Sequence, residues 1–337
     1  MTDGRAPIRV PIALLLCAMS AFALFAAGEP LGLGPLAWVA PVPLLVAIVR
    51  VEKVRWAWTY GVVFGLVYFG IELSWIFLFG WMAWTALTIV MALYVSAGTL
   101  VAGILRRTSL APLLIAGAWT GAELLRDRWP YGGYSWGSVG TTQGSVPGVR
   151  WLAGTVGAYG LSFLVVLIAC SFAYRVAGGR TSWSSLTIAG VVLMGFVAVD
   201  LESSSRRERT GTPTELLVVQ GGVPRPVRPG QRDAIFTSHI DITRQLLDHA
   251  RDRGNRIVVW PEDSLGIGVS PNAYDQVKLL AQEYGVPFII GRSVVDADGR
   301  FLNLVKYIDS TGTEKGTYQK RHPVPFGEYV PIGFLRR

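Results

Sequence analysis

The stretch "ESSSRRERTGTPTELLVVQ", residues 202–220, separates two halves of very different composition. Its first part is polar and contains Ser, Thr, Gly and Pro, which is typical of a linker. Its last part, "ELLVVQ", is a short apolar and β-branched run that predicts a strand. We therefore divide the chain into a first domain at 1–200, a linker at 201–213 and a second domain at 214–337.

The composition of the whole chain points to a membrane. Of its 337 residues, 51% are apolar and only 16% are charged, which departs from the balance of a typical soluble protein. The 31 basic and 23 acidic residues give a net charge of 31 − 23 = +8, and most arginines lie between apolar runs. That placement favours a membrane surface as partner. No basic stripe interleaved with aromatic residues predicts binding to nucleic acid.

A series of apolar stretches fills the first domain, and each approaches the roughly 20 residues that cross a hydrocarbon core. Pro41, Pro43 and Pro112 interrupt or shorten the second and fifth stretches. Glu72 and Glu123 fall inside stretches, where a carboxylate is a functional candidate; hydrogen bonding between helices is the alternative. The seven predicted spans lie at roughly 10–27, 33–49, 57–79, 83–105, 110–126, 153–174 and 184–200.

Basic residues are concentrated in alternate loops between these spans. By the positive-inside rule, the basic loops and the N-terminus face the cytoplasm, and an odd number of spans then places the second domain on the extracytoplasmic side. The other loops are poorer in basic residues, although the long loop after the fifth span has Arg126, Arg128 and Arg150. The residues assigned to the cytoplasmic side are Arg5, Arg9, Arg50, Lys53, Arg55, Arg106, Arg107, Arg175 and Arg180.

The long loop, "RDRWPYGGYSWGSVGTTQGSVPGVRW" at 126–151, is rich in Gly, Trp and Tyr. Aromatic residues at this position usually anchor the membrane interface. The glycines exceed what an anchor requires, so a loop that folds back at the membrane surface, near a lipid substrate, is the second interpretation.

The second domain has the pattern of an α/β fold. Short β-branched runs recur in "RIVVW", "PFIIG" and "LNLVKYI", and helical spacing occupies 232–253 and 273–284 between them. "DADG" and "DSTG" are hairpin turns. Strands that alternate with helices predict an α/β layer structure.

Three residues of this domain are candidates for chemistry. Glu262, in "VVWPEDS", follows a strand at the edge where open α/β sheets keep their sites, and suits a general base; a helix cap or turn acid is the alternative. Lys320, after "GTYQ", suits the stabilisation of an oxyanion, unless it is an ordinary surface lysine. Glu328 lies in a loop that contains three prolines, and such rigidity suits a positioned side chain.

Taken together, the motifs that contain these residues indicate a family far more specifically than each residue does alone. "WPE" after a strand, followed by "YQKRHPVPFGEYVP", resembles the nitrilase superfamily. With the spans in front, the chain resembles the apolipoprotein N-acyltransferase family, in its actinobacterial form. "PLAWVAPVPLL", "WPYGGYSWGSVGTTQ", "VVQGGVP" and "FLNLVKYIDSTG" extend the resemblance over nearly the whole chain. It implies a multi-span α-helical membrane bundle followed by an α/β nitrilase-like domain, an α-β-β-α sandwich.

The resemblance also implies a Glu–Lys–Cys mechanism. A cysteine thiolate takes an acyl chain from a phospholipid, and the α-amino group of a diacylglyceryl-cysteine in an apolipoprotein then accepts it. Carried over by position, Glu262 is the general base, Lys320 stabilises the oxyanion and Glu328 supports the lysine. No metal and no cofactor are implied. The implied location is the bacterial plasma (inner) membrane, with the catalytic domain outside.

Two departures from the family's pattern matter. Gly222 stands where the family usually has asparagine after "QG", which is expected to loosen the first strand turn. The nucleophilic cysteine should follow the lysine, but the chain ends at Arg337, so we expect a truncated nitrilase-like domain that is inactive alone. Cys17 and Cys170 lie in apolar runs and are expected to be small buried hydrophobic residues.

Two other functions remain as alternatives. One is a non-catalytic, membrane-anchored nitrilase-like module for binding or assembly. The other is a transporter, suggested by the bundle alone and disfavoured by the specific motifs of the second domain. Some actinobacterial members are joined to a polyprenol-phosphate mannose synthase, whose sequence is not present here.

Overall fold

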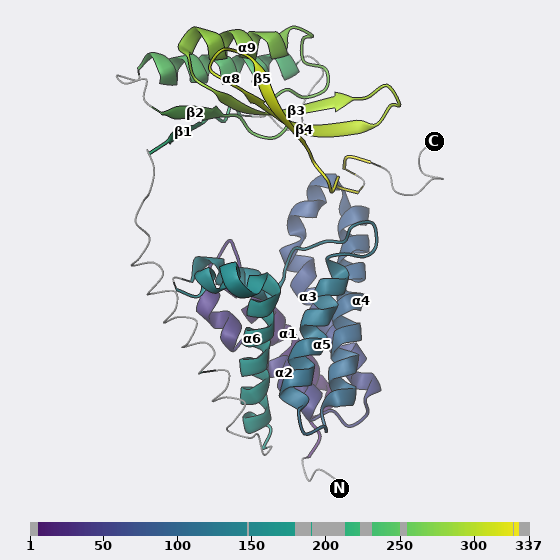
Figure 1. The fold of residues 1–337 in the computed structure, drawn as a ribbon. Helices are drawn as coiled ribbons and strands as arrows, with labels where there is room; N and C mark the ends of the chain where they lie inside the picture. Colours follow the sequence, from purple (N-terminus) through teal and green to yellow (C-terminus); the bar gives the residue numbers. More distant parts are fainter. Residues whose placement is uncertain are drawn as a thin grey trace. The chain divides into compact units, whose positions relative to one another are not determined.

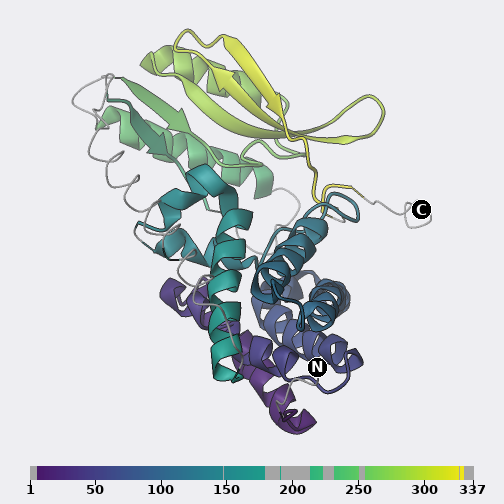
Figure 2. The same ribbon diagram turned by 60° about the horizontal axis from the view of Figure 1, so that its bottom comes forward.

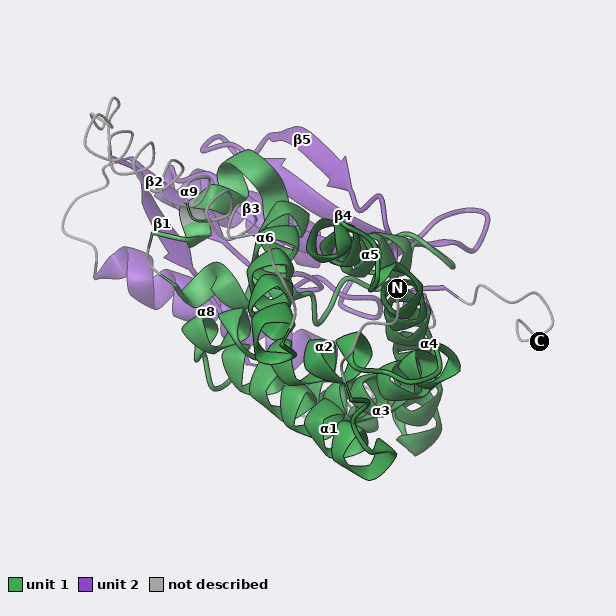
Figure 3. Cartoon of the chain, turned by 90° about the horizontal axis from the view of Figure 1, so that it is seen from below, with its two compact units in different colours: residues 1–208 green, residues 209–337 purple. Residues whose placement is uncertain are grey.

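The computed structural model describes residues 6–146, 148–178, 190, 213–222, 231–249, 255–325 and 327–329. Figure 1 follows the chain along its length. The chain divides into two compact units, residues 1–208 and 209–337, which Figure 3 distinguishes by colour. Each unit has its own hydrophobic core. The predicted linker lies almost wholly outside the described residues.

The described part of unit 1 is helical. Three of its helices are long and apolar enough to cross a membrane: α1, α4 and α6. This finding supports a membrane protein and confirms the predicted helical class of the first half. The α-helices are α1 (Val10–Ala27), α2 (Val42–Val49), α3 (Arg55–Glu72), α4 (Trp81–Leu105), α5 (Ala111–Arg126) and α6 (Ala153–Val176), with 3-10 helices η1 (Gly34–Trp38), η2 (Ser74–Phe79), η3 (Val139–Ser145) and η4 (Arg150–Leu152).

Two predicted spans are not continuous α-helices. The second is divided into η1 and the short α2, because Pro41 and Pro43 restrict the chain to a helix start at that point. The third ends at Glu72, and the apolar run after it forms η2, which stops at Gly80 with a φ of 105°. The interruption of the second span is the one that its prolines predict, whereas hydropathy had joined α3 and η2 into one span because both are apolar. The seventh predicted span, 184–200, lies outside the described residues apart from residue 190.

Small residues allow α3 and α4 to pack closely, as the two views in Figures 1 and 2 show. A Cβ on Gly61 would lie 2.6 Å from the Ser96 Cα, and one on Gly65 would lie 2.6 Å from the Ala92 Cα. Without side chains at these positions the two backbones approach directly. This is how helices associate where lipid removes the hydrophobic drive for packing.

Unit 2 contains a mixed five-stranded sheet in the order β1-β2-β3-β4-β5. The strands β1 (Glu215–Val218), β2 (Arg256–Val259) and β3 (Phe288–Val295) are parallel, and β4 (Phe301–Ile308) and β5 (Glu314–Gln319) continue as antiparallel hairpins. Turns at "DADG" and "DSTG" connect the last three strands, as the sequence predicts. The helices are α8 (Gln231–Asp248) and α9 (Ala273–Tyr284).

Both helices cover one face of this sheet (Figure 1). Val277 and Leu280 of α9 join Phe288 and Ile308 of the sheet in the core, and each is at most 2% exposed. The other face carries apolar side chains that the described residues leave exposed, among them Val218, Val305 and Tyr318. The described part of unit 2 therefore supplies one helical layer and one sheet layer of the predicted sandwich.

Candidate active site

Glu262 is placed by the end of a parallel strand. β2 ends at Val259, and the next residue, Trp260, is 2% exposed and donates its indole N–H to the Thr243 hydroxyl at 3.0 Å. This contact fixes the chain where it leaves the sheet, and Glu262 follows two residues later. The predicted position at the carboxyl edge of the sheet is the one observed.

Gly291 of β3 makes room for the backbone around Glu262. A Cβ at this position would lie 2.3 Å from the Pro261 carbonyl oxygen and 2.6 Å from the Glu262 Cα. The Gly291 carbonyl also accepts hydrogen bonds from the Ser264 hydroxyl at 2.9 Å and the Leu265 amide at 3.0 Å. A residue with a side chain would push the carboxylate segment away from the sheet, so this glycine sets the position of Glu262.

Lys320 and Glu328 are held on the other side of the site by β5 and the loop after it. The Lys320 amide donates to the Asn303 carbonyl at 2.9 Å, which continues the β4–β5 pairing to the lysine. In the loop, the Glu328 amide donates to the Val324 carbonyl at 2.8 Å, and the Val324 amide donates to Glu328 Oε2 at 2.7 Å. This reciprocal pair closes a tight turn and turns the Glu328 carboxylate inward.

The three predicted site residues meet at one point. Lys320 Nζ donates to Glu262 Oε1 at 3.0 Å and to Glu328 Oε1 at 3.0 Å. Their side chains differ in exposure: Glu328 is 12% exposed, Lys320 30% and Glu262 62%. The lysine thus bridges one enclosed carboxylate and one that faces solvent.

Asn303 completes the cluster, and the sequence analysis did not single it out. Its side-chain amide donates to Glu262 Oε1 and to Glu328 Oε1, the latter at 2.7 Å. The residue is 9% exposed and lies in β4 opposite Ser293. An asparagine within the otherwise β-branched run "FLNLVKYI" was the available signal, because a buried amide in a strand needs a partner.

Hydrogen bonds and charge shift the protonation of this cluster. Partial burial alone would lower the pKa of Lys320, but hydrogen bonds and charges from Glu262 and Glu328 outweigh it, and the net pKa is raised. Partial burial alone would raise the pKa of Glu328. Donors from Asn303, Val324 and Lys320 reverse this, and the net pKa is lowered. Both shifts favour the charged forms of Lys320 and Glu328, and so they favour the ion pair between the two side chains.

Neither cysteine of the sequence joins this cluster. Cys17 in α1 and Cys170 in α6 are both fully buried in the core of unit 1. Gly222 has a φ of 73°, a conformation that glycine adopts freely and asparagine tolerates, so either residue suits the backbone there. Among the residues described, no group of three His, Cys, Asp or Glu side chains is arranged to hold a metal ion.

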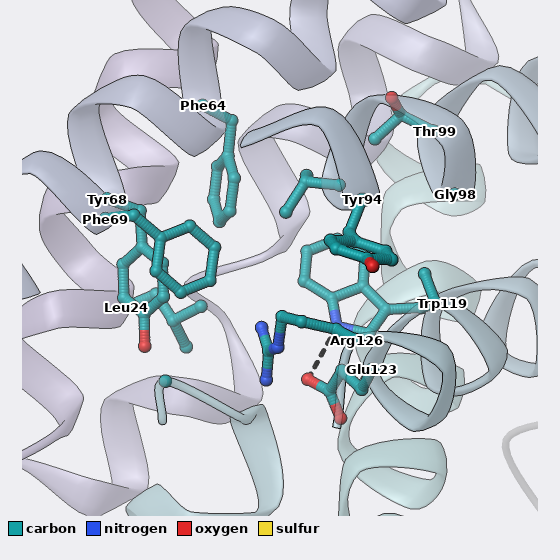
Figure 4. A pocket seen from close by; sticks show the side chains of 13 residues that line it. Leu24, Phe64, Tyr68, Phe69, Tyr94, Gly98, Thr99, Trp119, Glu123 and Arg126 are labelled. Carbon is teal, nitrogen blue, oxygen red and sulfur yellow. Dashed lines mark hydrogen bonds between the residues drawn. The ribbon is translucent and has the colours of Figure 1, made fainter. Parts of the chain in front are cut away.

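A second polar cluster holds the long loop of unit 1. Glu123 Oε1 accepts the Trp119 indole N–H at 3.1 Å (Figure 4) and the Val139 amide at 2.9 Å. Arg126 Nη2 donates to the Ser138 hydroxyl at 2.8 Å. The Gly- and aromatic-rich segment therefore folds back onto the end of α5, as the second interpretation of its sequence proposed. Its place at the membrane surface near a lipid substrate stays a prediction. Glu123 therefore takes part in hydrogen bonds between structural elements of unit 1. Hydrogen bonding between helices is the alternative that the sequence analysis gave for a carboxylate inside a span.

The chain is similar in sequence to known proteins over most of its length. Residues 20–171 match the family model of the apolipoprotein N-acyltransferase N-terminal domain. The chain is similar to proteins named apolipoprotein N-acyltransferase from Geobacter metallireducens (30% identity, 90% of this chain, 62% of the relative), Methylococcus capsulatus (28%, 81% and 56%) and Gloeobacter violaceus (28%, 93% and 63%). This chain therefore spans less than two thirds of the length of these relatives.

Proposed function

We propose, from its relationship to the apolipoprotein N-acyltransferases, that this membrane protein takes part in transferring a phospholipid acyl chain to the α-amino group of a lipoprotein's diacylglyceryl-cysteine. The observation that carries the proposal is the Lys320 ammonium, held at 3.0 Å from both Glu262 and Glu328 at the carboxyl edge of the sheet. A base and a cation that share one reacting centre are what acyl transfer requires.

The proposed reaction has two halves. Glu262 takes the proton of a cysteine thiol, the thiolate attacks the ester carbonyl, and the ester C–O bond breaks. The lysophospholipid leaves as an alcohol with the proton that Glu262 returns, and a thioester remains. The amine then attacks the thioester carbonyl, Glu262 takes a proton from nitrogen, and the thiol is released as the amide forms.

The two carboxylates have different roles in this scheme. Glu262 Oε2 accepts no hydrogen bond from the described residues and the side chain is 62% exposed, so it is free to exchange a proton with a substrate. Glu328 receives donors on both oxygens and is 12% exposed. We assign Glu328 to keeping Lys320 charged and in place, so that the ammonium stabilises the oxyanion in both halves.

The thiol is proposed to come from the part of the relatives that this chain does not span. Cys17 and Cys170 are buried in unit 1 and so are poor candidates. Joining the corresponding C-terminal part of the Geobacter metallireducens relative to Arg337 should give a chain that forms a thioester with phospholipid and acylates a diacylglyceryl peptide, measured by mass spectrometry. Residues 1–337 alone should do neither.

This experiment separates the proposal from its alternatives. A thioester on Cys17 or Cys170, or turnover by residues 1–337, would place the nucleophile elsewhere. An extended chain that folds and binds the diacylglyceryl peptide but forms no thioester would favour the non-catalytic binding module.

The orientation is proposed from the alternating basic loops. Thr108 follows α4 beside Arg106 and Arg107, and Thr311 lies in an exposed turn of unit 2. In a chain whose native cysteines are replaced by serine, a membrane-impermeant maleimide added to whole cells should label Thr311→Cys and leave Thr108→Cys unmodified. The reverse pattern would invert the orientation.

A further inference from the structure

Glu262 lies in a short turn between two backbone hydrogen bonds to β3. The Trp260 amide donates to the Ile289 carbonyl at 2.9 Å, and the Leu265 amide donates to the Gly291 carbonyl at 3.0 Å. The two acceptors are two residues apart on β3, whereas the two donors are five residues apart, so the chain between the donors leaves the edge of the sheet as a turn. Whatever holds this turn therefore also holds the backbone of Glu262.

Asp263, the residue that follows Glu262, has a left-handed backbone conformation with a φ of 59°. This conformation is costly for a residue with a Cβ, although Asp tolerates it better than most residues do. It persists where the surrounding structure holds it, and such strain is concentrated at functional sites. The turn at Glu262 is therefore one that neighbouring groups must hold in place.

The contact that holds Asp263 comes from the first turn of α8. Arg232 Nη1 donates to Asp263 Oδ2 at 2.6 Å, and the two side chains are 31% and 38% exposed. Gly266 makes room for the pair, since a Cβ there would lie 2.4 Å from Arg232 Nη1 and 2.8 Å from Asp263 Oδ1. The next residue of α8, Asp233, accepts a hydrogen bond from the Ser270 amide at 2.8 Å. The start of α8 thus holds this segment at two points.

The side-chain contacts of Glu262 weaken when the proposed reaction needs them. Its Oε1 accepts hydrogen bonds from Lys320 and Asn303. Once Glu262 has taken a proton, its carboxyl group is neutral and attracts the Lys320 ammonium far less, and the oxyanion then requires the same ammonium. The ion pair of Arg232 and Asp263 takes no part in this proton transfer, so it continues to hold the turn.

We propose that the Arg232–Asp263 ion pair is a positioning element for the general base, because it holds the turn after β2 and so keeps the Glu262 carboxylate beside Lys320 while Glu262 gains and loses a proton. Both residues of the pair act through Glu262 and need not touch the substrate. This role in catalysis rests on the acyl transfer proposed above, whereas the position of Glu262 can be measured without it.

Zero-length cross-linking of the whole 337-residue protein measures this position. A water-soluble carbodiimide activates a carboxylate, and a neighbouring amine displaces the resulting urea to form an amide, with net loss of water. Lys320 Nζ lies 3.0 Å from both Glu262 Oε1 and Glu328 Oε1, so the two carboxylates compete for one amine. Peptide mass spectrometry gives the ratio of the Glu262 product to the Glu328 product. Loss of the overall fold would lower both products, so the ratio reports on Glu262 alone.

The first variants change the arginine. Arg232→Met should lower the ratio about three- to fivefold, the upper range for a half-exposed ion pair. Arg232→Lys keeps the charge and should restore part of the ratio. Arg244→Met is the matched control, because it removes another arginine of α8, one that pairs with Glu283, and it should keep the wild-type ratio.

The second variants change the aspartate. Asp263→Gly adopts a φ of 59° without strain but removes the carboxylate, so it should lower the ratio as much as Arg232→Met does. The double variant should fall no further, since either change alone already breaks the same pair. An unchanged ratio in Arg232→Met, an equal fall in Arg244→Met, or additive effects of the two single changes would overturn the proposal.

The extended chain then tests the role in catalysis. Arg232→Met should lower kcat about tenfold, because a misplaced base slows the chemical step, and should leave the KM for the diacylglyceryl peptide nearly unchanged. Arg232→Lys should recover part of the loss. Normal transfer by Arg232→Met in an active extended chain would overturn the proposal and leave the proposed function standing. If the extended wild-type chain transfers no acyl group, the proposed function fails, and the cross-linking ratio alone decides whether the ion pair positions Glu262.

Discussion

Each unit contains one cluster of carboxylates and cations. The two clusters differ in how far their charged side chains are exposed and in what their hydrogen bonds do. Glu123 and Arg126 of unit 1 are 5% and 3% exposed, and they use backbone and side-chain partners to fold a loop onto a helix end. Glu262 and Lys320 of unit 2 have side chains that are 62% and 30% exposed, and one oxygen of Glu262 accepts no hydrogen bond from the residues that the structure describes. The charged side chains of the buried cluster hold a loop on a helix end. The exposed cluster keeps a carboxylate, that of Glu262, which can still exchange protons.

The comparison predicts that loss of the exposed cluster removes activity and leaves the fold intact. In the extended chain, Glu262→Gln removes the base, and Lys320→Met removes the oxyanion's cation. Each should lower acyl transfer by about 10² to 10⁴, the usual worth of such groups. Acylation of a diacylglyceryl peptide measures the effect, and the thermal midpoint should move little. Lys315→Met, an exposed lysine of β5 that pairs with Asp309, is the control. Near-normal transfer in either variant would remove that residue from the mechanism.

Loss of the buried cluster in unit 1 should instead lower the stability of the fold. Glu123→Leu removes the acceptor of the Trp119 and Val139 N–H groups and leaves Arg126 short of balancing charge in an apolar unit. Leaving these two N–H groups without an acceptor costs about 1–3 kcal/mol for each group that stays buried. Thermal unfolding in detergent, followed by tryptophan fluorescence, should show the loss. Glu29→Leu, a substitution in the loop after α1, is a control expected to change little. A Glu123→Leu protein as stable as the wild type would mean that the loop is held by other contacts.

Much of this architecture is predictable from local patterns, and what is not depends on geometry across the chain. Apolar runs predicted the positions of α1, α4 and α6, since length and hydropathy are local properties. Pro41 and Pro43 predicted the interruption of the second span, which is the break between η1 and α2. The end of α3 at Glu72 was not predicted, because hydropathy does not distinguish one long helix from two short apolar pieces.

The candidate site was also predicted only in part from local sequence patterns. The motifs identified Glu262, Lys320 and Glu328, and the structure brings the three side chains together. Asn303 was missed because its contribution depends on the register of β3, β4 and β5, which a single strand's sequence does not reveal. Gly291 was missed for a related reason: only the packed backbone shows that a Cβ there would meet Pro261 and Glu262. The catalytic roles themselves remain proposals.

Asn303 allows a further test of the difference between the two clusters, because it is mostly buried and donates hydrogen bonds to the carboxylates of the exposed cluster. Asn303→Leu keeps the approximate size but removes the donors to Glu262 and Glu328, so both carboxylates lose a partner and Lys320 is held less firmly. We expect acyl transfer in the extended chain to fall about 10- to 100-fold, as for loss of one or two oriented hydrogen bonds to charged groups. The pH dependence of transfer should shift too, since Glu328 loses a donor that lowers its pKa. A lower rate with an unchanged pH profile would indicate a structural role only.

The smallest expected effect is a dependence on pH within the Glu328 turn. The folded pKa of Glu328 is lowered and that of Lys320 is raised. A lowered carboxylate pKa stabilises the fold above the unfolded value of about 4.3 and loses this contribution as pH falls through the folded pKa. A raised lysine pKa stabilises below about 10.4 and loses it as pH rises through the folded pKa. The turn should therefore be held most firmly between about pH 5 and pH 10.

The Val324 amide reports on this directly, because it donates to Glu328 Oε2 at 2.7 Å. Its hydrogen-exchange protection, corrected for intrinsic rates, should fall by a factor of about 3 to 10 as the pH is lowered from 6 through the folded pKa of Glu328, the worth of one hydrogen bond. In Glu328→Gln, which carries no charge over this range, protection should be lower throughout and nearly independent of pH. The Val258 amide donates to the Pro287 carbonyl at 3.0 Å and serves as the reference, since no carboxylate accepts from it. If Val324 lost protection equally in both proteins, the carboxylate would not be what holds this turn, and the ion pair assigned to Glu328 and Lys320 would fail with it.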